Sequence, residues 1–320
     1  MAGLLACECG GRVQSPQDLR GSVNITAIVI LSRGKCGLNK CITRYLVAMA
    51  AADVMVVVFA VIVEQVNSIY VFCGFLLITP VCSVTLVLRL ASTDCSVWFT
   101  VAFTFDRYVA ICHQKFRKQY CTERTATMVI AAVVAGSCAR CTPAYFVVEP
   151  YVMIDTVPWR CVQKAEFFTS PFWKAFELID SILTPLLPIC LILLFNALTT
   201  RHIIMANRVR RSLRNNSQHQ DPEVRNRRKS MVLLFALSAN FILLWMPYVV
   251  HSMKWQVQNY FYTDKYLNTP VFIAQQFGFM LQFLSTCTNT CIYGLTQRKF
   301  REELRNGAKY LVTLNGLLCN

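Results

Sequence analysis

Charged residues are scarce in this chain. Asp, Glu, Lys and Arg make up 15% of its 320 residues, whereas 55% of the residues are hydrophobic. Soluble globular domains carry roughly a quarter charged residues, so the scarcity argues against an ordinary soluble domain. The apolar content also excludes an intrinsically disordered chain. The composition instead indicates a protein that is solvated by lipid.

The motifs of common enzyme classes are absent as well. The sequence has no HExxH, no phosphate-binding loop and no GxSxG. Four histidines stand far apart, and the sixteen cysteines mostly occur singly inside apolar runs. Such cysteines are typical of small core residues rather than of metal ligands. We therefore expect no enzyme, no organic cofactor and no catalytic metal centre.

Long hydrophobic runs are present throughout the chain. A transmembrane helix needs about 20 mostly apolar residues. The runs long enough are Tyr45–Val63, Ile78–Ile111, Met128–Val148, Leu178–Thr199, Met231–Met253 and Pro270–Leu295. A seventh run, Gly21–Leu31, covers only half a span, and Pro16 before it opposes a helix. The pattern predicts an all-α bundle of seven transmembrane helices whose first helix is truncated at its N-terminal half.

The positive charge of the chain lies in particular loops. The net charge is +15, and the segment from Arg201 to Lys229 alone holds nine basic residues. The loops after the first and third spans and the C-terminal tail are also basic. The other loops together carry only five basic residues. Because basic loops stay in the cytoplasm, we expect a multi-pass plasma-membrane protein with its N-terminus outside and its C-terminus inside. The charge then indicates attraction to anionic membrane lipid, not to nucleic acid. The residues Met1–Ala6 do not look like a cleavable signal.

Short motifs recur in a fixed order along these spans. Asp106-Arg107-Tyr108 ends the third span at its cytoplasmic side, and a basic loop follows. The other motifs are Gly21-Ser22-Val23-Asn24, the stretch LVAMAAAD that ends at Asp53, Pro188, Phe241 with Trp245-Met246-Pro247, and Asn289-Thr290-Cys291-Ile292-Tyr293. Together they resemble the motifs of rhodopsin-like G-protein-coupled receptors from Asn24 to about Leu311. Within that family, the segment FDRYVAICH is most similar to the orphan-receptor branch numbered 139 and 142.

The resemblance implies a domain plan and partners. An irregular segment would span residues 1–20, the seven-transmembrane receptor domain 21–296, and a short amphipathic eighth helix with the cytoplasmic tail 297–320. Phe300, among basic neighbours, looks like the start of that eighth helix. The implied partners are an extracellular small-molecule or peptide ligand, a heterotrimeric G protein and arrestin.

The resemblance also implies roles for particular residues. The G-protein switch would consist of Asp106, Arg107, Tyr108, Asn289, Tyr293 and Asn196. The residues that would transmit ligand binding are Phe241, Trp245, Pro247 and Pro188. An allosteric sodium ion would lie among Asp53, Ser96, Ser285 and Asn289, although a neutral buried Asp53 is an alternative. Cys82 and Cys161 would form an extracellular disulfide, with two free thiols as the alternative.

A ligand pocket is expected around Arg89, which lies 17 residues before Asp106. An arginine at this depth needs a partner, which Glu64, Asp94 or an acidic group of the ligand would supply. An internal Arg89–Glu64 pair and direct ligand contact remain equal alternatives. The other residues expected to line the pocket are Thr93, Tyr248, His251, Phe279 and Phe283.

Two other functional classes compete with a signalling receptor. A transporter would show internal repeats and paired broken helices, and we see no repeat. A receptor-like protein that does not signal is the second alternative, because helix one is incomplete. Nucleotide exchange on a G protein separates the first hypothesis from both.

Overall fold

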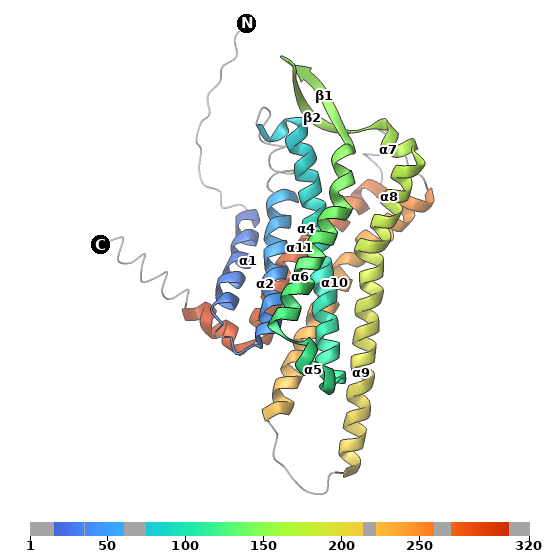
Figure 1. Cartoon of the computed structure of the whole chain (residues 1–320). Helices are drawn as coiled ribbons and strands as arrows, with labels where there is room; N and C mark the ends of the chain where they lie inside the picture. Colours follow the sequence, from blue (N-terminus) through green and yellow to red (C-terminus); the bar gives the residue numbers. More distant parts are fainter. Residues whose placement is uncertain (1–15, 35, 61–74, 214–221, 259–269, 307–320) are drawn as a thin grey trace, which may run out of the picture.

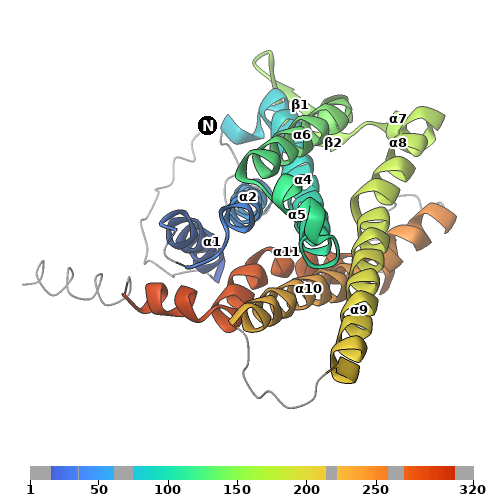
Figure 2. The same cartoon turned by 60° about the horizontal axis from the view of Figure 1, so that its bottom comes forward.

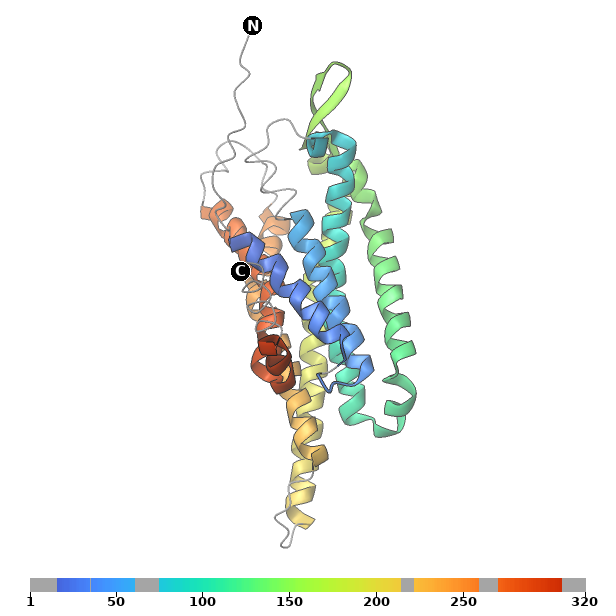
Figure 3. The ribbon, with the colours of Figure 1, turned by 90° about the vertical axis from the view of Figure 1, so that its left-hand side faces the viewer.

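The structure is a computed structural model that describes residues 16–34, 36–60, 75–213, 222–258 and 270–306. Long helices run side by side through most of it (Figures 1 and 3). The long elements are α1 (Pro16–Ser32), α2 (Lys40–Val56), α4 (Thr79–Cys112), α6 (Glu123–Cys141), α8 (Pro171–Ser181), η4 (Ile182–Leu186), α9 (Leu187–Leu213), α10 (Pro222–Gln258) and α11 (Pro270–Thr296). Figure 2, which looks obliquely from the end near α5 (Gln114–Tyr120), shows α11 between α1 and α10.

Shorter elements connect the long ones. They are η2 (Phe75–Leu77), η3 (Thr142–Phe146), α7 (Ala165–Thr169) and a hairpin of β1 (Val148–Ile154) and β2 (Val157–Gln163). Residues 298–306 form a further helix after α11. Figure 3 shows the hairpin at one end of the bundle and the ends of α9 and α10 protruding at the other.

The bundle has the inverted polarity of a membrane protein. Large apolar side chains such as Leu243 and Ile273 are 71% and 66% exposed on the outside, while Asp53 and Asp106 are fully buried inside. Such a surface suits hydrocarbon, where buried polar groups must find internal partners. The predicted all-α membrane bundle is confirmed.

Five stretches of the described residues are long and apolar enough to cross a membrane. They are Lys40–Ala60, Thr79–Cys112, Glu123–Phe146, Pro171–Ala206 and Met231–Lys254. α1 contributes a shorter apolar helix, Val23–Ser32, in agreement with a short first helix. α11 has the predicted extent but is not among the five, and it carries the run Ser285, Thr286, Thr288, Asn289 and Thr290.

The first helix begins earlier than predicted. The expected start was Gly21, with Pro16 opposing a helix, but α1 begins at Pro16 itself. A proline is tolerated in the first turn because the N–H groups of that turn have no partner within the helix. The prediction about Pro16 was therefore wrong.

The outer end of the fourth span also differs from the prediction. The apolar run predicted a helix to Val148, but α6 ends at Cys141 and a 3-10 turn containing Pro143 follows. The chain then forms the β1–β2 hairpin, in which Pro150 lies opposite Cys161. Asp155 and Thr156 between the strands have φ angles of 48° and 65°, the left-handed conformation of tight hairpin turns. The sequence reading missed this hairpin.

The eighth helix is present where it was predicted. Phe300 is 1% exposed, and its ring lies 6.1 Å from that of Tyr293, centroid to centroid. The Arg301 guanidinium donates to the backbone oxygens of Gly294 and Leu295 at 2.9 and 2.8 Å. These carbonyls belong to the last turn of α11 and have no helical partner, so Arg301 caps α11.

A buried polar contact joins α1 to α11. The Asn24 side chain donates to the Thr286 backbone oxygen at 3.0 Å and accepts from the Thr290 hydroxyl at 2.9 Å. Asn24 is fully buried and cannot bond to water, so these two contacts satisfy its amide group. Thr290 stands where the family motif has proline, and its hydroxyl forms a hydrogen bond between α11 and α1.

Thr290→Val should therefore lower the free energy of unfolding by about 1 to 2 kcal/mol, because it leaves the buried Asn24 oxygen unpaired. Thr288→Val is the matched control, since the Thr288 hydroxyl bonds only to backbone oxygens of its own helix. Thermal unfolding of the purified protein measures both. Equal stability of the two variants would contradict the role of this contact.

Candidate functional site

Asp53 is at the centre of a polar cluster that joins three helices. Its Oδ1 accepts from the Ser96 hydroxyl of α4 at 2.6 Å, and its Oδ2 accepts from the Asn289 amide of α11 at 3.0 Å. Ser285 is buried one turn before Asn289, but no hydrogen bond joins it to Asp53 in the described structure. Three of the four residues predicted to hold sodium therefore lie in direct contact.

Arg107 forms an ion pair with Asp106 near the C-terminal end of α4. The two residues are 6% and 0% exposed, and the guanidinium carbon lies 5.9 Å from the centre of the Phe103 ring. The arginine is thus held inward, in the arrangement expected for a resting receptor.

Two buried cysteines also contact Asp106. The Cys41 thiol of α2 donates to Oδ1 at 3.2 Å, and the Cys121 thiol lies 3.7 Å from the Asp106 backbone oxygen. Burial and the negative charge of Asp106 raise the pKa of Cys121 to about 12, so its thiol stays protonated at neutral pH. Sequence reasoning missed both residues, because the sequence does not distinguish a cysteine that bonds to a buried carboxylate from one that only packs in the core.

The remaining switch residues are only partly brought together. Tyr108 bonds to His113 at 3.1 Å and stacks on Phe195 at 5.7 Å between ring centroids. The Tyr293 hydroxyl and the Asn196 side-chain oxygen are both buried and make no hydrogen bond within the described residues. Asn196 and Tyr293 are therefore not joined in this conformation.

A cluster of rings surrounds the bend in α10. Trp245 is 3% exposed and packs against Phe241 at 5.2 Å and Tyr248 at 6.0 Å between ring centroids. Pro247 lies within α10 beside them, where it removes a backbone hydrogen bond and favours a kink. On the neighbouring helix, Pro188 follows the π-helical turn η4. The predicted aromatic and proline residues thus lie in and beside one apolar cluster.

Tyr248 connects this cluster to the expected ligand pocket. Its ring lies 5.4 Å from that of Phe279, and the backbone of Tyr248 comes so close to α11 that a Cβ on Gly278 would lie 3.2 Å from it. The charges of Asp180, Arg89 and Glu177 all act on the Tyr248 hydroxyl. Arg89 is therefore within electrostatic range of the predicted aromatic wall.

The other pocket residues have separate surroundings. The Thr93 hydroxyl bonds to the Arg89 backbone oxygen at 2.9 Å. His251 is 7% exposed, and its Nε2 atom is buried without a hydrogen-bond partner among the described residues. Phe283 lies half-buried on α11, one turn after Phe279. Glu64, the other proposed partner of Arg89, lies outside the described residues.

Asp94 has a different partner from the one suggested by sequence. It was one of three proposed partners of Arg89, but it pairs with Arg140 of α6, whose Nη2 atom lies 2.5 Å from Oδ1. The Ser137 and Thr184 hydroxyls donate to the same carboxylate at 2.6 and 3.2 Å. Arg140 also pairs with Asp180 of α8. We call Asp94, Arg140 and Asp180 the charged triad; sequence reasoning did not identify it.

The predicted disulfide is confirmed. Cys82 near the start of α4 is bonded to Cys161 of β2. The Thr79 hydroxyl donates to the Arg160 backbone oxygen at 3.0 Å, and Ile78 forms a β-bridge with Trp159. The hairpin is therefore attached to the outer end of α4 by a covalent bond and by backbone contacts.

The fold and these contacts define a rhodopsin-like seven-helix receptor, and comparison with known families agrees. Residues 23–293 match the family described as "7 transmembrane receptor (rhodopsin family)", so the chain belongs to that family.

Its relatives include the thyrotropin-releasing hormone receptor of Homo sapiens, which is 25% identical over 88% of this chain and 73% of the relative. The FMRFamide receptor of Drosophila melanogaster is 24% identical over 71% of this chain and 42% of the relative. The trace amine-associated receptor 13c of Danio rerio is 25% identical over 66% and 60%.

Arg140→Ala should destabilise the protein by about 3 to 5 kcal/mol, because it leaves two carboxylates unpaired inside the bundle. Arg298→Ala removes an exposed pair with Glu302 and should change stability by at most about 1 kcal/mol. Thermal unfolding of both variants in one detergent tests the difference. If Arg140→Ala unfolds at the wild-type temperature, the triad contributes nothing to stability.

Proposed function

We propose that the protein is a plasma-membrane receptor that binds a peptide or small molecule in its outer half and activates a heterotrimeric G protein through its cytoplasmic face. The family match over residues 23–293 is the main observation in favour, since it covers all the residues assigned to the switch. The names of three relatives refer to thyrotropin-releasing hormone, FMRFamide and tachykinin-like peptides, which supports a peptide ligand. No observation favours a transporter.

The placement of basic residues supports the proposed orientation. The loop from Arg201 to Lys229 and the tail would face the cytoplasm, and the disulfide-linked hairpin would face the oxidising exterior. On that face arrestin would compete with the G protein, and anionic lipid would bind the basic loops. We also propose that the protein is related to the orphan-receptor branch numbered 139 and 142, on the basis of the segment FDRYVAICH.

Arg107 is proposed as the residue that changes partner on activation. In the structure it is neutralised by Asp106 and shielded by Phe103. A conformation in which Arg107 turns toward the G protein must break this pair, so the pair favours the inactive state. The ligand needs only to bind the other conformation more tightly in order to shift the equilibrium.

Arg107→Ala should leave surface expression near wild type and abolish ligand-stimulated nucleotide exchange on G proteins in membranes. Arg117→Ala is the matched control, because Arg117 is an exposed arginine of the nearby helix α5. Full exchange by Arg107→Ala would contradict the proposed switch. Absence of exchange by the wild-type protein with every G-protein class would instead favour the receptor-like protein that does not signal.

An allosteric sodium ion is also proposed at Asp53. The residues fit a hard cation, because Asp53 and Ser96 offer a carboxylate and a hydroxyl oxygen within one buried cluster, and the Asn289 amide holds the carboxylate. A bound cation would supply the positive charge that a buried carboxylate lacks. Asp53 would anchor it, while Ser96 and Asn289, which now donate to Asp53, would orient the carboxylate; Ser285 would complete the set.

Asp53→Asn should remove the sodium dependence of agonist affinity while leaving the shape and hydrogen bonding of the side chain nearly unchanged. In the wild-type receptor, sodium should lower agonist affinity and potassium should not. The measurement is agonist binding at increasing sodium and constant ionic strength. An unaltered sodium response in Asp53→Asn places the ion elsewhere.

Arg89 is the proposed anchor for an acidic or carbonyl group of the ligand. It is half-buried on α4 beside Tyr248, and Phe279 packs against the same ring. A guanidinium binds a carboxylate through two parallel hydrogen bonds. An arginine next to aromatic rings therefore suits a ligand with one acidic end and an apolar body.

Arg89→Ala should weaken an acidic agonist by about tenfold to a hundredfold, and Arg89→Lys should restore part of the loss, since lysine keeps the charge without the paired donors. Competition binding with the acidic agonist and its amide gives the comparison. An equal loss for both ligands would show that Arg89 only supports the pocket structure.

A further inference from the structure

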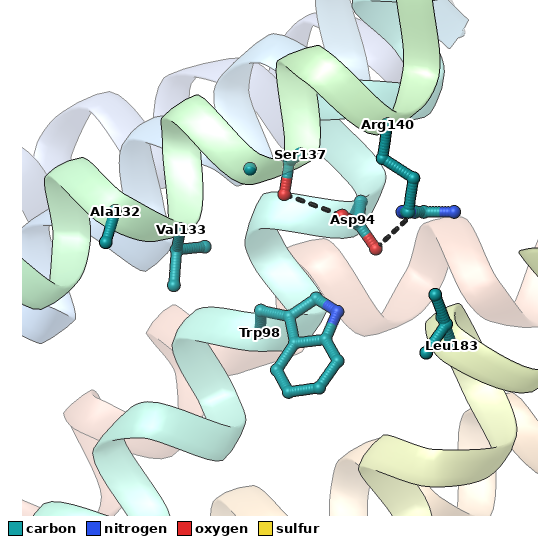
Figure 4. A pocket seen from close by; sticks show the side chains of 8 residues that line it. Asp94, Trp98, Ala132, Val133, Ser137, Arg140 and Leu183 are labelled. Atoms are coloured by element: carbon teal, nitrogen blue, oxygen red, sulfur yellow. Dashed lines mark hydrogen bonds and ion pairs between the residues drawn. The ribbon is translucent and has the colours of Figure 1, made fainter.

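A cavity lies between α4, α6 and η4, and neither Asp53 nor Tyr248 is among the residues that line it. Its volume is about 210 Å³. Figure 4 shows Asp94 and Trp98 of α4 on one side and residues of α6 on the other. Leu183 of η4, with Ala132 and Val133 of α6, makes much of the remainder apolar. An enclosed apolar cavity of roughly 150 Å³ accepts benzene, so a small ring with a short chain matches this more open space in size.

The cavity opens on the outward face of α6. Ala132 and Gly136 line it and are exposed, whereas Ser137 and Asp94 at its inner end are 4% and 2% exposed. An added Cβ on Gly136 would meet no atom within 4 Å. In a membrane this face of α6 is turned to lipid, so a ligand that partitions into the bilayer reaches the cavity directly.

Two members of the charged triad, Asp94 and Arg140, line the cavity, and the triad as a whole has an excess of negative charge. In the charged triad one guanidinium, that of Arg140, serves two carboxylates, Asp94 and Asp180. The formal charges add to −1, which is unfavourable in a medium of low dielectric constant. Among the described residues, Asp94 Oδ2 accepts a hydrogen bond only from Ser137, so it can accept a second one.

An indole ring lies on the same wall as this carboxylate. Trp98 is one turn after Asp94 on α4, and Figure 4 shows both side chains at the cavity. The face of an indole attracts cations, and among aromatic side chains it does so most strongly. A carboxylate and an indole ring that line the same space are complementary to an ammonium group.

We propose that this cavity binds a lipophilic organic cation, namely a protonated amine on a compact apolar body. The ammonium group donates to Asp94 Oδ2 and faces the Trp98 ring, and its charge brings the total of the triad to zero. The apolar body fills the space beside Val133 and Leu183. An anion is disfavoured because two carboxylates flank the Arg140 guanidinium, and a neutral alcohol gains a hydrogen bond without neutralising the charge.

Three compounds of equal shape test the proposal on the full-length receptor in lipid nanodiscs. They are 4-phenylbutylamine, 4-phenylbutanol and 4-phenylbutyrate, followed by saturation-transfer difference NMR with empty nanodiscs subtracted. The amine should bind at least about tenfold more tightly than the alcohol, and the acid should not bind. Equal binding of the amine and the alcohol overturns the proposal, because the charge would then play no part.

Matched variants place the amine within the protein. Asp94→Asn should reduce amine binding to the level of the alcohol, and Gly136→Leu should block both by filling the mouth. Ala131→Leu, an exposed position of α6 outside the cavity, should leave binding unchanged. Gly136→Leu retains the triad, so it stays informative if Asp94→Asn fails to fold. Amine binding that survives Gly136→Leu puts the amine elsewhere, for example beside Glu177, and refutes the cavity site.

Discussion

Polar side chains inside this protein must be satisfied by one another, because the bundle is surrounded by hydrocarbon. The Asp53 cluster, the Asp106–Arg107 pair, the charged triad and the Asn24 contact all follow from that constraint. Each of them joins different helices except the Asp106–Arg107 pair, which lies within α4. Apolar packing against lipid-like neighbours does not specify how helices are rotated, so these polar contacts fix the arrangement.

The same contacts explain why α4 is central to function. Ser96, Asp94 and Asp106 lie on one helix and connect it to α2 and α6, and the disulfide at Cys82 attaches its N-terminal end to the hairpin. Asp106 is bound by its own neighbour Arg107 and by a thiol of α2. A helix held at so many points is a fixed reference for its neighbours, whereas α10 contains an internal proline, Pro247, which removes a backbone hydrogen bond.

The spans and the eighth helix were predictable because each depends on a run of neighbouring residues with one kind of side chain. The charged triad was not, because it depends on how α6 and α8 are rotated about their axes, which no local pattern records. The hairpin was missed for a different reason: the apolar residues after Pro143 read equally well as more helix. Asn196, where the family usually has tyrosine, and Tyr293 were assigned to the switch from the resemblance, but no hydrogen bond joins them in the described structure.

The close approach at Gly278 has a mechanical consequence. Because Tyr248 backbone atoms lie almost against α11 there, and Pro247 is the adjacent residue, the weak point of α10 sits directly beside a fixed point of support. If α10 bends at Pro247, the long arm that begins at Pro222 moves while the short arm that ends at Gln258 stays against α11. A small displacement of the rings near Pro247 would then produce a larger displacement at the far end of the long arm, because the two arms of α10 differ in length.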